Sequence, residues 1–267
     1  MLINALKQKK ILILGFGKEG QDSFLFLKNK FPNMNIGIAD EKAKDDFPKE
    51  TQKLFRKAKT HLGKDYLDSL KEYQVVIKAP GIPYHVIEPY VSKRQIVTSA
   101  TSIFFSNCPG IIVGITGTKG KSTIASLIHA MLKQEGLPSY LIGNIGKPPL
   151  QFLKNALPDD IFVYELSSFQ LEKMTESPDI AVFLNLYPEH LNHHKTFGAY
   201  KKAKANITSF QTKIDFLIYN EKDEEVKSIA AKSNAQKLTF VPKAKNTSFL
   251  APLEAAAVTA KLLGVSS

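Results

Sequence analysis

The sequence predicts an α/β protein built on parallel sheets, and three observations lead to this fold class. Short β-branched runs alternate with helical patterns along the chain, which is typical of βαβ units. Two of the turns between such a run and the next helical pattern are rich in glycine. The chain is 43% hydrophobic, which is enough for a buried core. At roughly 150 residues per domain, its length indicates about two domains.

The β-branched runs give the expected elements in chain order. We expect ten strands, at residues 11–14, 36–39, 75–78, 96–98, 111–115, 140–142, 161–164, 180–184, 216–219 and 238–241. The first helix would carry Phe24, Leu25 and Leu27 on its apolar face. Pro109 and Gly110 stand just before a new strand, so we place the domain boundary there. The prediction is one α/β domain over residues 1–107 and a second over residues 108–267.

Composition excludes several classes of protein. The net charge of +11 favours anionic partners, but it is spread along the chain and there is no tryptophan, so we expect no nucleic-acid binding. The single cysteine, Cys108, excludes an internal disulfide. The longest uncharged stretch, residues 95–118, contains proline and glycine and does not resemble a membrane-spanning helix. We therefore expect a monomeric cytoplasmic protein without membrane insertion.

The first glycine-rich turn has the spacing G-x-G-x-x-G, at Gly15, Gly17 and Gly20. Glycines here let the backbone approach a pyrophosphate at a helix N-terminus. Asp40 closes the next strand, where an acid that binds a ribose would lie. The pattern fits a Rossmann-like domain that binds a dinucleotide or a nucleotide sugar. The alternative is that the glycines only form a tight turn and that Asp40 is a solvated strand end.

The second glycine-rich turn, residues 114–123, precedes a helix with apolar residues at positions 124, 127, 128, 131 and 132. In such a phosphate loop backbone N–H groups surround the phosphates, a lysine balances their charge and a hydroxyl ligates Mg²⁺. The strict spacing needs glycine at position 115, where this chain has isoleucine, so the loop is a variant. The pattern predicts ATP binding by Gly114, Thr116, Gly117, Thr118, Lys119, Gly120, Lys121, Ser122 and Thr123.

Mg²⁺ also needs a hard oxygen ligand near the phosphates. Glu165 ends an apolar strand, and the carboxyl ends of parallel strands face the crevice where ligands bind. We therefore expect Glu165 to be a magnesium ligand. The alternative is a surface glutamate at a strand end.

These motifs together resemble the Mur ligases, ATP-dependent enzymes that add amino acids to peptidoglycan precursors. Beside the phosphate loop, Asn144 and His190 lie in two further stretches that match family motifs. Residues 165–171, together with 79–83 and 98–101, resemble the branch that adds D-glutamate. The resemblance covers residues 11–210 and implies a Rossmann-like UDP-sugar domain followed by a P-loop ATPase domain with a mostly parallel sheet.

The resemblance also implies a reaction and its site. ATP would phosphorylate the alanyl carboxylate of UDP-N-acetylmuramoyl-L-alanine, and the amine of D-glutamate would attack the acyl phosphate. The implied catalytic residues are Lys121, Glu165, His190 and Lys204. Two Mg²⁺ ions would be held by Ser122, Glu165, His190 and Lys204. The UDP-sugar would contact Gly15, Phe16, Gly17, Asp40, Gly81, Asn144 and His190.

Lys204 matches the lysine that the family carbamylates with CO₂, which turns an ammonium that repels Mg²⁺ into an oxygen ligand. Carbamylation needs a neutral amine, and we expect Lys201, Lys202 and a metal site to lower the pKa of Lys204. The alternative is a solvated basic helix face. We interpret His193 and His194 as loop residues. The family usually has an acidic residue where this chain has Asn192, and an aspartate where this chain has Glu189.

The family also has a third, C-terminal domain that binds the incoming amino acid. Residues 252–263 predict a helix ended by Gly264, similar to the end of the family's central domain. The His-Asn pair expected before it is replaced by Ser248 and Phe249. The chain would be a fragment or a natural truncation. Two rival functions stay open: a catalytically silent module that binds ATP and a UDP-sugar, and an NAD-linked oxidoreductase, which would leave the second glycine turn unexplained.

Overall fold

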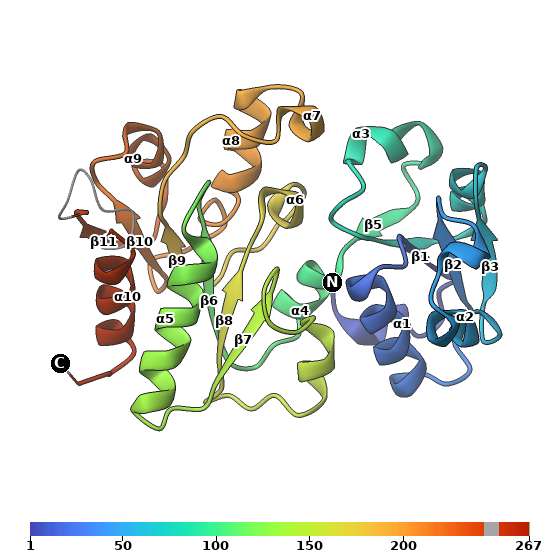
Figure 1. The fold of residues 1–267 in the computed structure, drawn as a ribbon, viewed down its shortest axis with the longest axis horizontal. Coiled ribbons are helices and arrows are strands. Elements are labelled where there is room, and N and C mark those ends of the chain that lie inside the picture. The colour runs from blue at the N-terminus through green and yellow to red at the C-terminus, as the bar shows by residue number, and fades with distance from the viewer. Residues whose placement is uncertain (243–250, 267) are drawn as a thin grey trace. The chain divides into compact units, whose positions relative to one another are not determined.

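The computed structural model describes residues 1–242 and 251–266. The chain forms two compact units, each with its own sheet (Figure 1). The first unit comprises Met1–Asn107 together with Pro148–Lys154, and the second comprises Cys108–Lys147 and the chain from Asn155 onward. All strand pairs in the described residues are parallel, so the predicted α/β class is confirmed.

The first unit has a five-stranded sheet in the order β3-β2-β1-β4-β5. Its strands are β1 (Ile11–Leu14), β2 (Ile36–Asp40), β3 (Lys59–Leu62), β4 (Val75–Lys78) and β5 (Ile96–Thr98). Its helices are α1 (Lys18–Lys30), α2 (Lys49–Phe55), α3 (Tyr84–Ile87) and α4 (Ala100–Phe105). From β1 the chain first adds β2 and β3 on one side of the sheet and then β4 and β5 on the other. In open α/β sheets, ligands bind where the order of strands switches sides in this way, here between β1 and β4.

The core of the first unit follows the apolar pattern of the sequence. Every residue of β1 is buried, and Phe24 and Leu27 of α1 face the core, whereas Leu25 is 44% exposed. The sequence does not predict β3, because this edge strand has only one aliphatic residue, Leu62, and is exposed or half-buried along its length. Pairing with β2 holds β3 in place, because all four residues of β3 pair with residues of β2.

The second unit has a six-stranded sheet in the order β11-β10-β9-β6-β8-β7. Its strands are β6 (Ile111–Thr116), β7 (Ser139–Gly143), β8 (Ile161–Glu165), β9 (Ile180–Phe183), β10 (Phe216–Asn220) and β11 (Gln236–Phe240). All ten predicted strands are therefore confirmed, and no end is shifted by more than two residues. Because β6 lies between β8 and β9, the loop after β6 has their carboxyl ends on its two sides.

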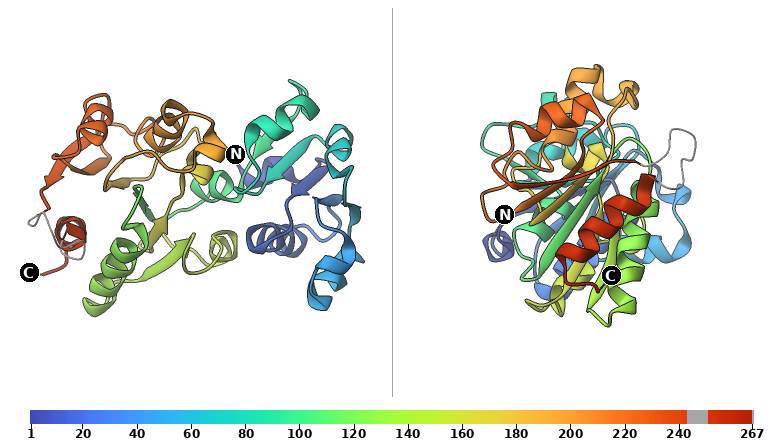
Figure 2. Two further views of the ribbon diagram at one scale, coloured as in Figure 1. Left: turned by 45° about the horizontal axis from the view of Figure 1, so that its top comes forward. Right: turned by 90° about the vertical axis from the view of Figure 1, so that its left-hand side faces the viewer.

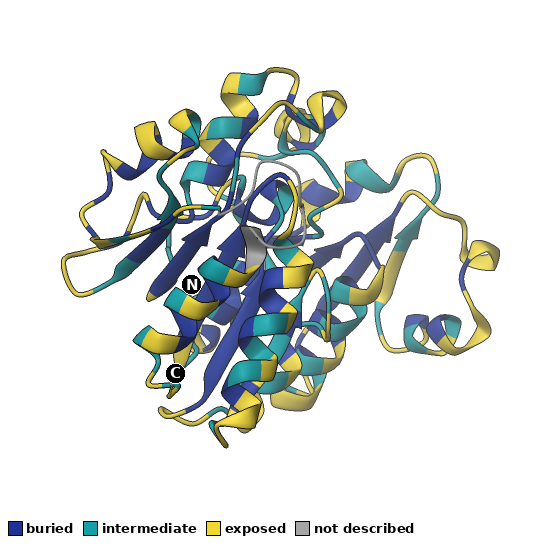
Figure 3. Cartoon of the chain, turned by 60° about the vertical axis from the view of Figure 1, so that its left-hand side comes forward, coloured by how far each residue is buried: buried dark blue, intermediate teal, exposed yellow. Residues whose placement is uncertain are grey.

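Helices cover the second sheet. They are α5 (Lys121–Gln134), α6 (Ser168–Leu171), α7 (Leu191–His194), α8 (Phe197–Ala205), α9 (Glu224–Ala230) and α10 (Ala251–Leu262). Helices α5 and α10 lie side by side on one face (Figure 2), and Ala255 and Ala256 join the core around Ile124 and Ile128. The central strands β6, β8 and β9 are buried almost throughout, while the edge strand β11 is mostly exposed and the helices expose their outer sides (Figure 3).

The predicted C-terminal helix is α10, and Gly264 follows it at φ +86°. Ser248 and Phe249 lie outside the described residues. Within residues 1–242 and 251–266, every helix is too short or too polar to cross a bilayer.

Candidate active site

The predicted phosphate loop connects β6 to α5. Gly120 caps α5 at φ +86°, a left-handed conformation that costs other residues about 1–2 kcal/mol. Ser122 and Thr123 are exposed in the first turn of α5. The positive end of the helix dipole and two free hydroxyls therefore lie where a phosphate and its metal ion would bind.

Asn185, directly after β9, holds this loop in place. Its Oδ1 accepts hydrogen bonds from the backbone N–H groups of Thr118 and Lys119, both at 3.0 Å, and its Nδ2 donates to the carbonyl oxygen of Lys119 at 3.1 Å. The sequence reasoning missed this role, although Asn185 begins the stretch that contains His190. The amides of Thr118 and Lys119 are thus engaged within the protein.

Three other predicted ATP-binding residues are packed into the structure beneath the loop. The Thr116 hydroxyl donates to the carbonyl of Leu166 at 2.9 Å, and the Thr118 hydroxyl lies 3.1 Å from that of Tyr200. Gly114 lies within β6, where a Cβ would be 2.7 Å from the Pro178 side chain. The structure therefore gives these residues a supporting position, and their contact with ATP stays a prediction.

Lys121 folds back over the loop. Its Nζ donates to the carbonyl oxygens of Gly117 at 3.1 Å and Thr118 at 3.0 Å. Burial lowers the pKa of Lys121, and the negative charges of Glu165 and Glu189 oppose this shift. The lysine is therefore placed at the loop, within the electrostatic influence of both carboxylates, as the phosphate-loop interpretation requires.

Glu165 ends β8 and pairs with Ile115 of β6, so its side chain lies at the same edge of the sheet as the loop. The residue is 1% exposed. Its Oε1 accepts a hydrogen bond from Nδ2 of Asn144 at 3.0 Å, whereas Oε2 is buried without a hydrogen-bond partner among the described residues. A buried carboxylate oxygen without a partner is costly, and a hard oxygen is what Mg²⁺ prefers, so the residues fit a divalent cation.

Lys204 is buried in α8 and is 2% exposed, so the interpretation of a solvated helix face is wrong. Its Nζ donates to the carbonyl of Gly117 at 2.8 Å and to Oγ1 of Thr116 at 3.2 Å. Burial, aided by the charge of Lys121, lowers the pKa of Lys204 to about 7.

The sequence pointed to other causes for this shift, namely the neighbouring lysines Lys201 and Lys202 and a metal site. In the structure, Lys201 pairs with Glu225, and Lys202 is exposed. The pKa of Lys204 is therefore lowered by packing and by a lysine distant in sequence, which adjacency along α8 could not show.

His190 stands at the N-terminus of α7 with a φ of +54°, which is uncommon for a residue with a side chain. Its side chain is 46% exposed, and its ring lies 4.9 Å from that of Phe169. Left-handed backbone at non-glycine residues concentrates at functional sites. The conformation therefore accords with the predicted role of His190.

His193 and His194 do not lie in a loop, so this expectation is wrong. They form the end of α7 and are 7% and 6% exposed. Burial, together with the charge of His193, lowers the pKa of His194 to about 4. The sequence suggested a loop because the polar run after His190 has no apolar periodicity, but four residues still form one helical turn, whose last two side chains are buried.

In the first unit, the predicted UDP-sugar residues gather at the carboxyl edge of the sheet. Gly15 has φ +86°, and a Cβ there would lie 2.7 Å from that of Ala79 in the loop after β4. Asp40 is 9% exposed, which rules out a solvated strand end, and its Oδ2 accepts from the backbone N–H of Phe16 at 2.6 Å. Gly17 caps α1, and Gly81 is exposed in the loop after β4.

The ring of Phe16 cannot contact a ligand, because it is fully buried. It packs against Phe24 and Phe55 at centroid distances of 5.8 and 5.5 Å. Any contact of Phe16 with a UDP-sugar would therefore involve its backbone.

The two parallel sheets, and the glycine-rich loop that precedes Lys121 at the start of α5, define an α/β protein with a candidate phosphate loop. Residues 115–265 match the Mur ligase middle domain. The chain therefore belongs to the Mur ligase family.

Several named relatives are similar over most of this chain. It is 35% identical over 239 residues, 88% of its length, to UDP-N-acetylmuramoylalanine--D-glutamate ligase of Acetivibrio thermocellus, and 35% identical over 243 residues to the ligase of the same name from Streptococcus pneumoniae. It covers 51% and 54% of these proteins, so the chain spans about half the length of the curated relatives it matches.

Solved structures agree on the fold. The crystal structure of UDP-N-acetylmuramate:L-alanyl-gamma-D-glutamyl-meso-diaminopimelate ligase from Neisseria meningitides superposes with a TM-score of 0.61 over 96% of this chain and 94% of that one, at 16% identity. At this identity the likeness establishes the fold alone.

Proposed function

We propose that this chain provides the UDP-sugar-binding and ATP-binding parts of a ligase that joins D-glutamate to UDP-N-acetylmuramoyl-L-alanine in peptidoglycan precursor synthesis. One observation carries the proposal: Lys121, Lys204 and the unpartnered oxygen of Glu165 all lie at the phosphate-loop edge of one sheet. The names of the relatives support the choice of substrates.

The reaction has two steps. The γ-phosphoryl group of ATP passes to the alanyl carboxylate oxygen, which gives an acyl phosphate and ADP. The neutral amine of D-glutamate then attacks the acyl carbon, phosphate leaves, and the amine loses a proton as the amide forms. Phosphoryl transfer depends mainly on in-line positioning and charge neutralisation. Lys121 would contribute to both positioning and charge neutralisation. Its Nζ would donate to phosphate oxygens in place of the carbonyl oxygens of Gly117 and Thr118.

Two Mg²⁺ ions would neutralise phosphate charge at this site. The residues proposed to hold them are Ser122, Glu165, His190 and Lys204 as its carbamate. The exposed hydroxyl of Ser122 and the unpartnered Oε2 of Glu165 support this set. Asn144 would keep the Glu165 carboxylate oriented through the hydrogen bond that it already donates.

The burial of Lys204 supports the proposed carbamate. With a pKa of about 7, about half of the side chain is a neutral amine at pH 7, against about 0.03% at the ordinary value of 10.5. A neutral amine adds to the carbon of CO₂ and releases a proton, which leaves an anionic carbamate. Protein equilibrated with ¹³C-bicarbonate should show a carbamate carbon by NMR, and the signal should be absent from Lys204→Met.

The proposed UDP-sugar contacts are Gly15, Phe16 through its backbone, Gly17, Asp40, Gly81, Asn144 and His190. We further propose that the protein acts as a cytoplasmic monomer, in support of cell shape and cell division. The alternative function is a module that binds ATP and a UDP-sugar without catalysis.

Two measurements test the proposal. Calorimetry on the chain of 267 residues should show binding of Mg·ATP and of UDP-N-acetylmuramoyl-L-alanine. ADP release by the gene product that contains this chain should then require both UDP-N-acetylmuramoyl-L-alanine and D-glutamate. Binding without turnover in that product would favour the silent module, and failure to bind either ligand would reject both interpretations.

A further inference from the structure

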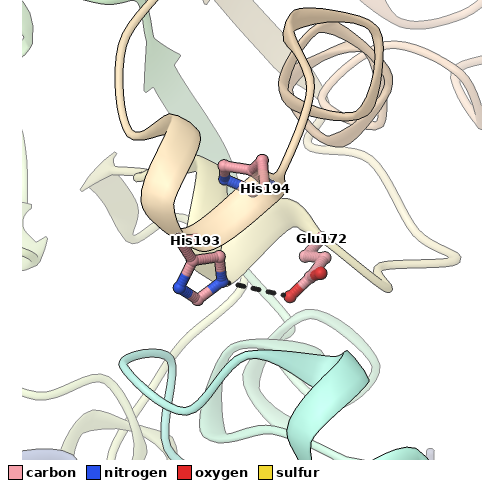
Figure 4. Close-up of side chains that lie close together, drawn as sticks. All are labelled: Glu172, His193 and His194. Carbon is pink, nitrogen blue, oxygen red and sulfur yellow. Dashed lines mark hydrogen bonds and ion pairs between the residues drawn. The ribbon is translucent and has the colours of Figure 1, made fainter.

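A second group of metal-ligand side chains lies outside the phosphate-loop site, in the second unit. It consists of Glu172, directly after α6, and His193 and His194, the last two residues of α7 (Figure 4). One ligand atom from each residue lies within 4.8 Å of those of the other two. No metal ligand assigned above belongs to this group.

We propose that Glu172, His193 and His194 bind a transition-metal ion of the Zn²⁺ class. Two imidazoles and one carboxylate are a ligand set that zinc uses in sites with an open fourth position. Imidazole nitrogen favours zinc, cobalt and nickel, whereas magnesium prefers oxygen ligands. The site would therefore discriminate against the Mg²⁺ ions proposed at the phosphate loop.

The separation of two ligand atoms matches such an ion. Nε2 of His193 lies 3.4 Å from Oε2 of Glu172. Two donors bound tetrahedrally at about 2.0–2.1 Å from zinc are about 3.3–3.4 Å apart, whereas N–H···O hydrogen bonds are usually about 2.7–3.2 Å long. This pair is therefore already spaced for a shared metal ion, and a ligand atom of His194 lies within 4.8 Å of both.

The surroundings fix the two imidazoles and leave a way in for the ion. The ring of Phe169 lies against both histidines, at centroid distances of 4.1 Å to His193 and 5.6 Å to His194. The Ser168 hydroxyl lies 2.9 Å from Nε2 of His194. Such outer contacts hold metal-binding histidines in one orientation. The Glu172 side chain is 19% exposed, so the group is reachable from solvent.

A metal ion here would connect two elements of the proposed active site. Glu172 lies seven residues after Glu165, and His193 lies three residues after His190. The ion would therefore hold α6 against α7, the two helices that follow these proposed magnesium ligands. We expect it to stabilise the fold rather than to take part in the chemistry.

Co²⁺ binding to the tag-free chain tests the proposal, because tetrahedral Co²⁺ absorbs visible light. In excess Mg²⁺, we expect one equivalent of Co²⁺ to give d–d bands and Zn²⁺ to displace it. His193→Asn and Glu172→Gln should each weaken Co²⁺ binding by at least about tenfold, as even outer-contact losses do at metal sites. Glu165→Gln, at the magnesium site, and His85→Asn, which removes an exposed histidine of α3, should bind Co²⁺ as the unaltered chain does.

Each outcome decides the question. Absence of Co²⁺ bands at millimolar metal would overturn the proposal, as would equal binding by Glu172→Gln and the unaltered chain. Circular dichroism identifies any variant that fails to fold. If His193→Asn fails to fold, Glu172→Gln still tests the proposal, because glutamine preserves the shape of the glutamate side chain. Loss of Co²⁺ binding in Glu165→Gln alone would assign the ion to the phosphate-loop site instead. None of these readouts requires ligase activity.

Discussion

Replacing Lys204 with methionine should remove a large part of the pH dependence of stability. Lys204 is 2% exposed and its pKa is lowered from 10.5 to about 7, chiefly by burial. The folded chain therefore releases the Lys204 proton at a lower pH than the unfolded chain. Between pH 7 and 10.5 the unfolded chain binds more protons, so this lysine makes the free energy of unfolding rise with pH across that window.

The size of the effect follows from the shift. At about 1.4 kcal/mol per pH unit, burying the charged form costs about 5 kcal/mol below pH 7, where the contribution is nearly flat. Between pH 6 and 9 the contribution of Lys204 to the free energy of unfolding should rise by about 2–3 kcal/mol. Methionine is close in length and does not titrate, so the variant should lack this rise.

Urea denaturation from pH 6 to 9 measures the difference. Buffers free of CO₂, Mg²⁺ and nucleotide keep Lys204 as an amine. Lys202→Met, on the exposed side of the same helix, is the matched control and should follow the wild-type profile. Parallel profiles for the wild type and Lys204→Met would show that burial does not lower this pKa, and the argument for a neutral amine would fail.

Three further substitutions probe the same site. Glu165→Gln should weaken Mg²⁺-dependent ATP binding at least about tenfold in calorimetry, because a metal ligand is lost; unchanged binding would mean that Glu165 holds no metal ion. Asn185→Ala removes three hydrogen bonds to the loop and should lower the free energy of unfolding by about 1–3 kcal/mol, with weaker ATP binding; unchanged values would mean that the loop holds itself. Gly120→Ala should cost about 1–2 kcal/mol in urea denaturation through its φ of +86°, since its Cβ would meet only Leu184 at 3.7 Å.

The strands could be predicted from the sequence where a short run of apolar residues marks them. The apolar runs locate ten strands, and seven of these are central strands of parallel sheets, which are buried on both faces. The edge strand β3 escapes this reasoning, since its two exposed residues, Lys59 and Thr60, give no apolar signal. The apolar runs do not reveal the order of the strands. Only the structure shows that β8 and β9 lie on either side of β6, and so flank the phosphate loop.

The site was predictable at its loop and less so around it. Gly120, Lys121 and Ser122 form a local pattern, so the sequence reveals them. The anchoring of the loop by Asn185, 66 residues from Lys119, depends on the pairing of β6 with β9, which no local pattern contains. The burial of His193 likewise depends on packing against Phe169.

Lys204 and Glu165 both carry the free-energy cost of burying a charged group, and their charges are opposite. One is a buried cation that Lys121 repels, and the other is a buried carboxylate with an oxygen that no described group satisfies. A direct ion pair would relieve both, yet Lys204 donates to Gly117 and Thr116 instead. A carbamate would turn the repulsion from Lys121 into attraction, and a cation shared with Glu165 would satisfy the free oxygen. Because one change at Lys204 removes both costs, the two residues are better explained as parts of one metal-binding site than as separate defects of packing.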